Sequence, residues 1–359
     1  MRFTTRLAAA AVTVCGAAAG LVACSNGDST GTTATTASSA TSTAAADEGT
    51  LVIYSGRSED LVAPLIEDFT EETGIEVEVR YGSTAEQAQL LLTEGDASPA
   101  HVFLSQEAGA LGLLQEQGML TELPAETIAL VADGYSSEDN EWVGITGRAR
   151  VVTYDQDTVT EADAPATVEQ MVDPKWKGQI GVAPGNASFL AFVTAMRVTE
   201  GEDATREWLE KLAANEPKTY KKNGDILEAV NNGEVQIGLI NHYYWYSAAA
   251  EKGAENMRAQ LKWGADGDLA GLINATGVGV LTKGAGREDA QAFVDFLLSE
   301  HAQTYFAQET FEYPLVTGIA GPEGVPPLDS MKAPDVDLAK LGTVEESAAL
   351  IDEAGLTVD

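Results

Sequence analysis

Cysteine is nearly absent from this chain. Its 359 residues include only Cys15 and Cys24, and both lie in an apolar N-terminal stretch. The rest of the chain therefore has no disulfide to form and no thiolate to hold a metal ion. Histidine is also scarce. The three histidines, His101, His242 and His301, lie far apart in the sequence and lack the spacing of a conventional metal site.

Basic residues are few. The chain has 21 Lys and Arg against 56 Asp and Glu, which gives a formal net charge of −35 at pH 7. Such a charge argues against nucleic acid as a partner. Removal of a leader carrying Arg2 and Arg6 leaves 19 basic and 56 acidic residues, or −37. The acidity favours solubility and also raises the local cation concentration, and by itself it names no ligand.

Long apolar runs are missing after the first two dozen residues, since none approaches the roughly 20 residues that span a bilayer. At the N-terminus, Arg2 and Arg6 precede an almost wholly apolar or small segment, residues 7–22. This pattern is typical of a secretory signal.

The signal ends in Leu21-Val22-Ala23-Cys24, which resembles the lipobox of bacterial lipoproteins. The resemblance implies cleavage before Cys24 and a lipid anchor on its sulfur. The alternative is an ordinary secreted protein with a cysteine near its cleavage site. We expect residues 1–23 to be the signal peptide and residues 24–49 a flexible tether, because the latter are mostly Ser, Thr, Ala, Gly and Asp.

Strands and helices alternate after the tether. Apolar residues at 51–54 predict a strand, and Ser58 is placed to cap a helix whose apolar face runs to Phe69. Ser83 and Glu86 form a capping box for a second helix. The alternation predicts an α/β fold with a largely parallel sheet.

Two extended runs, residues 142–154 and 271–281, interrupt the alternation. We expect them to cross between two lobes, with a ligand cleft between the lobes and hinge closure around the ligand. The expected first lobe comprises residues 50–148 and 274–322. The expected second lobe comprises residues 149–273 and 323–359.

The chain is organised around two adjacent tyrosines, Tyr243 and Tyr244. They follow a buried strand at 235–240 and precede a helix at 247–252. At an irregular corner both hydroxyls can converge on one point. A hard trivalent cation such as iron(III) displaces phenol protons, whose free pKa is about 10. The alternative is an aromatic cluster that fills the core or stacks on an apolar ligand.

A second candidate site is the segment Pro-Gly-Asn-Ala-Ser-Phe at 184–189, which opens a helix. Its backbone N–H groups at Asn186, Ala187 and Ser188 are placed to bind an anion. The alternative is that Asn186 or Ser188 caps its own helix.

Four motifs occur in order along the chain: Leu-Val-Ile-Tyr-Ser-Gly-Arg at 51–57, Asp-Pro-Lys-Trp-Lys-Gly at 173–178, Asn-His-Tyr-Tyr-Trp at 241–245 and Glu-Tyr-Pro-Leu at 312–315. On these the chain resembles the iron(III)-binding proteins of bacterial ABC importers, a branch of the periplasmic binding proteins. The resemblance implies a two-lobed periplasmic-binding-protein fold with two crossover strands.

The same resemblance implies that Tyr243 and Tyr244 bind iron(III) with a synergistic anion, carbonate or phosphate. Arg57 occupies a position at which some relatives use an arginine to hold carbonate. Residues 184–189 resemble the family's anion loop. The expected protein is a monomeric, non-enzymatic lipoprotein on the extracytoplasmic face of the cell membrane. It would deliver iron to an ABC transporter permease and touch the membrane only through its lipid.

The chain also departs from the family. Ser58 and Gln106 stand where well-known relatives have histidine and glutamate, so the first lobe offers no obvious charged ligand. Tyr54, Tyr220 and Tyr246 remain open as a third phenol ligand. Arg148 and Arg150 lie on the expected crossing strand, where they either face the cleft or stiffen the hinge.

Two other functions remain in view. The same fold can bind a small organic anion, a phosphonate or carboxylate, gripped by Arg57 and the anion loop without metal. An enzyme is disfavoured, because the chain has no Gly-x-Ser-x-Gly elbow, no phosphate loop and no His-Glu-x-x-His.

Overall fold

The computed structural model describes residues 49–342 and 344–356. The predicted signal peptide, the lipobox cysteine and nearly all of the predicted tether lie outside the described residues. Within the described ranges, none of the helices is both long enough and apolar enough to cross a membrane.

The strands of the described residues form one mixed sheet in the order β2-β1-β3-β9-β4-β7-β5-β6, with β8 and β10 each paired to β4. The strands are β1 Leu51–Ser55, β2 Val77–Tyr81, β3 Val102–Ser105, β4 Val143–Asp155, β5 Ile180–Val182, β6 Lys218–Thr219, β7 Ile237–Asn241, β8 Ala259–Trp263, β9 Ile273–Val280 and β10 Tyr313–Pro314. The parallel pairs are β1 with β2 and β3, and β5 with β6 and β7. The expectation of a largely parallel sheet is wrong, because β4 and β9 run antiparallel to their neighbours.

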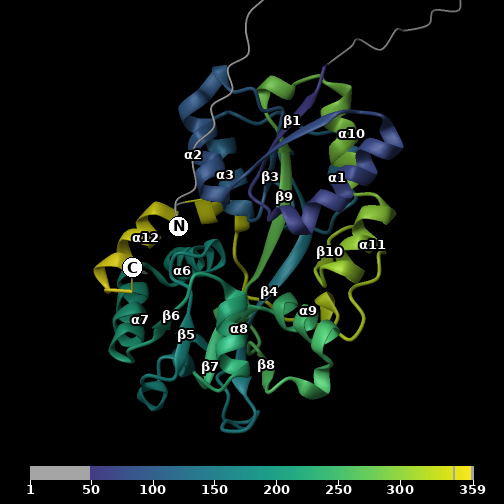
Figure 1. Ribbon diagram of the computed structural model, residues 1–359. Helices are drawn as coiled ribbons and strands as arrows, with labels where there is room; N and C mark the ends of the chain where they lie inside the picture. The colour runs from purple at the N-terminus through teal and green to yellow at the C-terminus, as the bar shows by residue number, and fades with distance from the viewer. Residues whose placement is uncertain (1–48, 343, 357–359) are drawn as a thin grey trace, which may run out of the picture. The chain divides into compact units, whose positions relative to one another are not determined.

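Strand β4 lies in the middle of this sheet and joins its two parts. Up to Ala149 it pairs with β9, and from Arg150 onward it pairs with β7 and β8. We call β2-β1-β3-β9 the first half-sheet and β7-β5-β6 with β8 the second half-sheet. Figure 1 shows β4 running from one to the other. The predicted crossing strand at 142–154 is therefore confirmed.

Helices cover both half-sheets (Figure 1). They are α1 Glu59–Thr73, α2 Thr84–Glu94, α3 Ala108–Glu116, α4 Ala125–Ile128, α5 Val168–Met171, α6 Ala187–Glu200, α7 Glu202–Ala214, α8 Asn223–Asn231, α9 His242–Lys252, α10 Glu288–Leu297, α11 Glu300–Glu309 and α12 Val344–Glu353.

Local sequence rules explain most helix ends. The Ser83–Glu86 capping box forms as expected at the start of α2. Gly74 ends α1 with φ of 73°, a left-handed conformation that glycine adopts readily. Ser58 precedes α1, but its side chain makes no capping hydrogen bond, so that expectation is wrong.

The main hydrophobic core contains residues from both half-sheets. On the first, the Phe69 ring lies 5.2 Å from Phe293 and 5.4 Å from Phe296, and on the second Phe192 lies 5.6 Å from Trp208. Each buried aromatic side chain contributes about 1.5–3 kcal/mol by leaving water. The two half-sheets are therefore held by one continuous core as well as by β4.

The C-terminal segment packs on elements from both halves. The 3₁₀ helix η7, Leu338–Gly342, lies against α3, and α12 lies against α6 and α7 (Figure 1). Glycines permit the first contact, because a Cβ atom at Gly109 or Gly112 would overlap the backbone of Leu341 or Ala339. On the other side, the Thr194 and Ser347 hydroxyls lie 2.8 Å apart.

Candidate functional site

Tyr243 and Tyr244 lie in the first turn of α9, directly after β7 ends at Asn241. Their rings stack with centroids 4.4 Å apart and planes inclined by 26°. The two phenols therefore lie side by side, and Tyr243 acts on the charge of Tyr244. This arrangement needs no irregular corner, because β7 passes into a regular helix without a loop. Convergence of the two hydroxyls on one ion remains a prediction.

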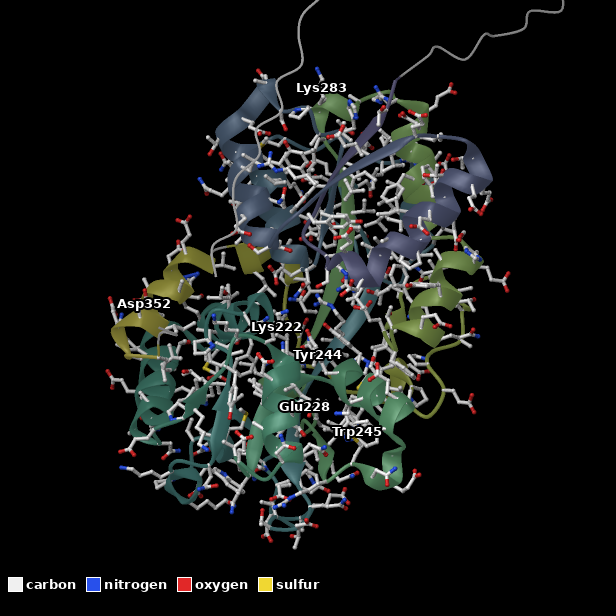
Figure 2. The ribbon with its side chains drawn as sticks, viewed as in Figure 1. Lys222, Glu228, Tyr244, Trp245, Lys283 and Asp352 are labelled. Carbon is white, nitrogen blue, oxygen red and sulfur yellow. The ribbon has the colours of Figure 1, made fainter. Side chains whose placement is uncertain are left out.

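The pair faces the first half-sheet. Figure 2 shows Tyr244 on the side of the second half that faces the first, with Trp245 farther away. Burial raises the pKa of Tyr244, and Tyr243 raises it further, whereas the charges of Arg57 and Arg148 act in the opposite direction. The N-terminus of α9 also favours negative charge on these oxygens.

His242 fixes the start of α9. It is fully buried, and burial lowers its pKa to about 4. The Ala149 N–H donates to Nδ1 at 3.2 Å, and Nε2–H donates to the Phe311 carbonyl oxygen at 2.8 Å. Its ring stacks on Tyr313 at 4.8 Å. The histidine therefore ties the tyrosine helix to β4 and to the segment before β10.

The other histidines stand apart. His101 accepts the Val52 N–H at 3.0 Å, and His301 lies 2.8 Å from Asp68. Across the described ranges, no three His, Cys, Asp or Glu side chains gather in a group fit for a metal ion. Phenolate oxygen is among the ligands that suit a hard cation.

Three arginines beside the tyrosines are almost completely buried: Arg57, Arg148 and Arg150 are 1%, 2% and 3% exposed. Arg57 Nη2 lies 2.7 Å from Glu312 Oε2, and Arg148 Nε lies 3.7 Å from Glu312 Oε1. Arg148 also donates to the Gln106 carbonyl oxygen. Arg57 is therefore a buried arginine paired with a buried carboxylate.

Among the residues that the structure describes, the hydrogen-bond acceptors of Arg150 are all neutral. It donates to Asn223 Oδ1 at 3.2 Å, to Asn241 Oδ1 at 2.9 Å and to the Leu239 carbonyl oxygen at 3.2 Å. Burial lowers the pKa of Arg150 to about 9, while negative charge on Tyr243 and Tyr244 would raise it. The guanidinium thus has no carboxylate partner among these contacts, and the two phenols lie close enough to interact with its charge.

The predicted anion loop opens α6. Asn186 caps this helix, since its Oδ1 accepts the Ser188 N–H at 3.1 Å and the Asn223 Nδ2–H at 3.0 Å. Ser188 Oγ accepts from Asn241 Nδ2 at 3.1 Å, and Ala187 is the first residue of α6. The Asn186 side-chain oxygen is therefore engaged as a cap, the alternative that the sequence left open.

A small cavity joins these groups. It is lined by Arg148, Arg150, Ser188, Asn241, Leu272 and Asn274. Within the described part of the chain, the buried Nε atoms of Arg148 and Arg150 have no hydrogen-bond partner. A cavity with unpartnered guanidinium N–H groups and amide and hydroxyl side chains has the chemistry of an anion site.

Sequence reasoning missed three residues of this arrangement. Asn241 and Glu312 belong to motifs quoted for the family resemblance, and their place in those motifs was the signal that could have been used. Asn223 had no such signal, because its role follows from contacts with Arg150 and Asn186.

The candidate third phenols lie in different places. The Tyr54 hydroxyl bonds Glu94 at 3.0 Å on α2. Tyr246 packs on Phe311 with ring centroids 6.1 Å apart, and Tyr220 lies beside Gly181. The structure brings together Tyr243 and Tyr244 and places Tyr54, Tyr220 and Tyr246 in other surroundings.

Two half-sheets that share a crossing strand, with buried polar groups where they meet, define the class of periplasmic binding proteins. The chain belongs to the bacterial extracellular solute-binding protein family, whose model matches residues 97–340.

Relatives in this family carry names that refer to iron. The chain is 34% identical to the Fe(3+)-binding periplasmic protein of Serratia marcescens, over 87% of this chain and 92% of the relative. It is 34% identical to the major ferric iron-binding protein of Neisseria meningitidis serogroup A, over 85% and 93%. These relatives match almost their whole length.

Solved structures agree. Iron-bound HitA from Pseudomonas aeruginosa superposes with a TM-score of 0.81 at 33% identity, covering 86% of this chain and 99% of that one. A Trichodesmium protein in complex with iron and citrate gives 0.74 at 26% identity, covering 86% and 100%. The fold expected from the sequence is therefore confirmed.

Proposed function

We propose that this protein is an extracytoplasmic solute-binding protein that captures iron(III) and delivers it to an ABC importer permease. The phenolate oxygens of Tyr243 and Tyr244 bind the ion, and a small synergistic anion completes its shell. The relatives named for ferric iron support this assignment. The stacked tyrosine pair in the first turn of α9 is the observation that carries it.

The charges around the pair explain why an anion is needed. Iron(III) with two phenolates keeps one positive charge, and three buried guanidinium groups lie nearby, two of them against Glu312. An oxyanion such as carbonate or phosphate offsets this excess. The Ser188 N–H is taken by Asn186 Oδ1, so at the N-terminus of α6 the proposed donor is the Ala187 N–H. The cavity beside Arg148 and Arg150 has a volume of about 10 Å³, so it must open before it admits an oxyanion.

The proposed lobes follow the half-sheets, with residues 50–148 and 274–322 in the first and residues 149–273 and 323–359 in the second. Support comes from β4, which changes partners between Ala149 and Arg150. Closure of the lobes would bring Arg57 and the tyrosines around one ligand. The proposed lipid on Cys24 is tested by the intact mass of the mature protein extracted from membranes.

The central experiment adds ferric nitrilotriacetate to the iron-free protein in bicarbonate buffer. We expect a visible phenolate-to-iron charge-transfer band and its loss in Tyr243→Phe and Tyr244→Phe. Tyr305→Phe is the matched control, because its partly buried hydroxyl donates to the Leu61 carbonyl oxygen and not to Tyr243 or Tyr244. A colourless parent protein, or two phenylalanine variants as coloured as the parent, would refute iron binding here.

The unpartnered arginine Nε atoms favour a second candidate, a small organic phosphonate or carboxylate bound without metal. In that case Tyr243 and Tyr244 donate neutral hydrogen bonds. A thermal-shift panel of such anions with and without iron separates the two functions, since the true ligand raises the melting temperature. Stabilisation by an organic anion alone, with no added effect of iron, would select this candidate.

A further inference from the structure

Glu312 is a completely buried carboxylate between two buried arginines. Its Oε2 accepts from Arg57 Nη2 at 2.7 Å and from Thr310 Oγ1 at 3.1 Å. Its Oε1 lies 3.7 Å from Arg148 Nε, and neither of these two atoms has a hydrogen-bond partner. Arg57 is 255 residues away in sequence, so this contact exists only in the folded chain.

The backbone around Glu312 holds it in this position. Phe311 adopts φ of 56°, a left-handed conformation that is uncommon for a residue with a side chain. The Phe311 carbonyl oxygen receives the His242 Nε2–H, and the Glu312 N–H donates to the Phe306 carbonyl oxygen at 3.1 Å. The same histidine begins the helix that carries Tyr243, so Glu312 and the tyrosine pair share one support.

Glu312 therefore faces two guanidinium groups, and a second buried carboxyl, Glu107, also acts on Arg148. Glu312, Arg57 and Arg148 together have a formal charge of +1. The contact between Glu312 and Arg148 is incomplete, because 3.7 Å is too long for a hydrogen bond. An oxyanion that enters beside Arg148 must compete with Glu312 for the same positive charge. The two arginines also act on Tyr244, which places this competition at the proposed site.

We propose that Glu312 is an internal competitor of the synergistic anion and limits how tightly a small oxyanion such as phosphate or carbonate is held. It acts through Arg57 and Arg148 as a positioning residue and touches neither metal nor anion. A weaker hold on the anion favours release of the cargo to a permease. This inference rests on the proposed function, since it deepens the account of the same site.

The test measures binding of inorganic phosphate, and separately of bicarbonate, to iron-free protein by isothermal titration calorimetry. Glu312→Gln removes the charge and keeps the shape. We expect it to bind phosphate at least tenfold more tightly, because the group then carries +2. Glu309→Gln is the matched control, with the same change of charge at an exposed position on α11, and we expect it to match the parent.

Glu312→Asp covers the case in which Glu312→Gln fails to fold. The shorter side chain keeps the charge but withdraws it from Arg57, so we expect intermediate tightening. Unchanged or weaker phosphate and bicarbonate binding in a folded variant overturns the inference. So does a parent protein that binds neither anion, even if it binds iron. A parent that binds phosphate but gives no iron colour refutes the iron assignment and leaves the Glu312 comparison decisive for the anion.

Discussion

Burial determines which partners the single polar residues at the site can have. Tyr243 and Arg150 lie out of water at 6% and 3% exposure, as does Glu107 at 4%, a carboxyl that acts on Arg148. Each of these polar groups depends on the partners that the fold supplies. The sequence could predict a role for the two tyrosines, because two adjacent phenols after a strand suit a hard cation. It could not predict that the three arginines are buried, because their burial depends on which strands pair in the folded chain.

Glu107 gives a residue-scale prediction. Burial raises its pKa to about 7, partly opposed by Arg148, and its Oε2 has no partner. The folded state keeps this proton up to about pH 7, whereas the unfolded chain releases it near pH 4.5. Stability from this group is therefore lost as pH rises through that window, by about 3 kcal/mol in all.

We expect Glu107→Gln to remove this loss. The measurement is urea unfolding of iron-free protein at pH 4.5, 6 and 8, compared with the parent. Glu116→Gln is the control, at an exposed position at the other end of α3, the helix that Glu107 precedes. It should keep the parent's pH dependence of stability. The prediction is contradicted if the free energy of unfolding falls with pH equally steeply in Glu107→Gln and in the parent.

Among the elements, α9 and β4 decide where the chemistry lies. The sequence predicted a strand before the tyrosines and a helix after them, but it placed the helix start at residue 247 rather than at His242. The aromatic residues at 243–246 have modest helix propensity, so tertiary contacts of His242 set the start. The β-branched run in β4 was recognisable, and its change of partners was not.

The contact between α3 and η7 gives an element-scale prediction. Replacing a helix glycine by alanine usually stabilises a protein by up to about 1 kcal/mol. At Gly112 the new methyl group would overlap the Ala339 carbonyl oxygen. We therefore expect Gly112→Ala to lower the free energy of unfolding by about 1–3 kcal/mol.

Chemical denaturation measures this change. Gly321→Ala is the control, because its Cβ would meet only the Tyr313 ring at 3.8 Å, an ordinary contact. A Gly112→Ala protein as stable as the parent would show that η7 does not press on α3 in solution.

At the scale of the described molecule, the shared strand and the continuous core predict one cooperative unfolding transition. Circular dichroism and tryptophan fluorescence should give coincident curves, since Trp142 reports on the first half and Trp208 on the second. Iron with bicarbonate at 100 times its dissociation constant should shift the whole transition by about 2.7 kcal/mol.

Tyr243→Phe should abolish that shift and keep a single transition. Two separate transitions would contradict the prediction that the two halves unfold together. So would a ligand that shifts the unfolding curve of only one of the two probes.

The sequence by itself determined the α/β class, the crossing strand, the capped start of α2 and the tyrosine pair, because these depend on neighbouring residues and their periodicity. Only the tertiary structure decided that Arg57 pairs with Glu312, that Arg148 and Arg150 line one cavity with Ser188, and that Asn186 caps α6. The reason is physical: a buried charge is stabilised by groups brought close in space, and the distance along the chain between Arg57 and Glu312 leaves no local pattern to read.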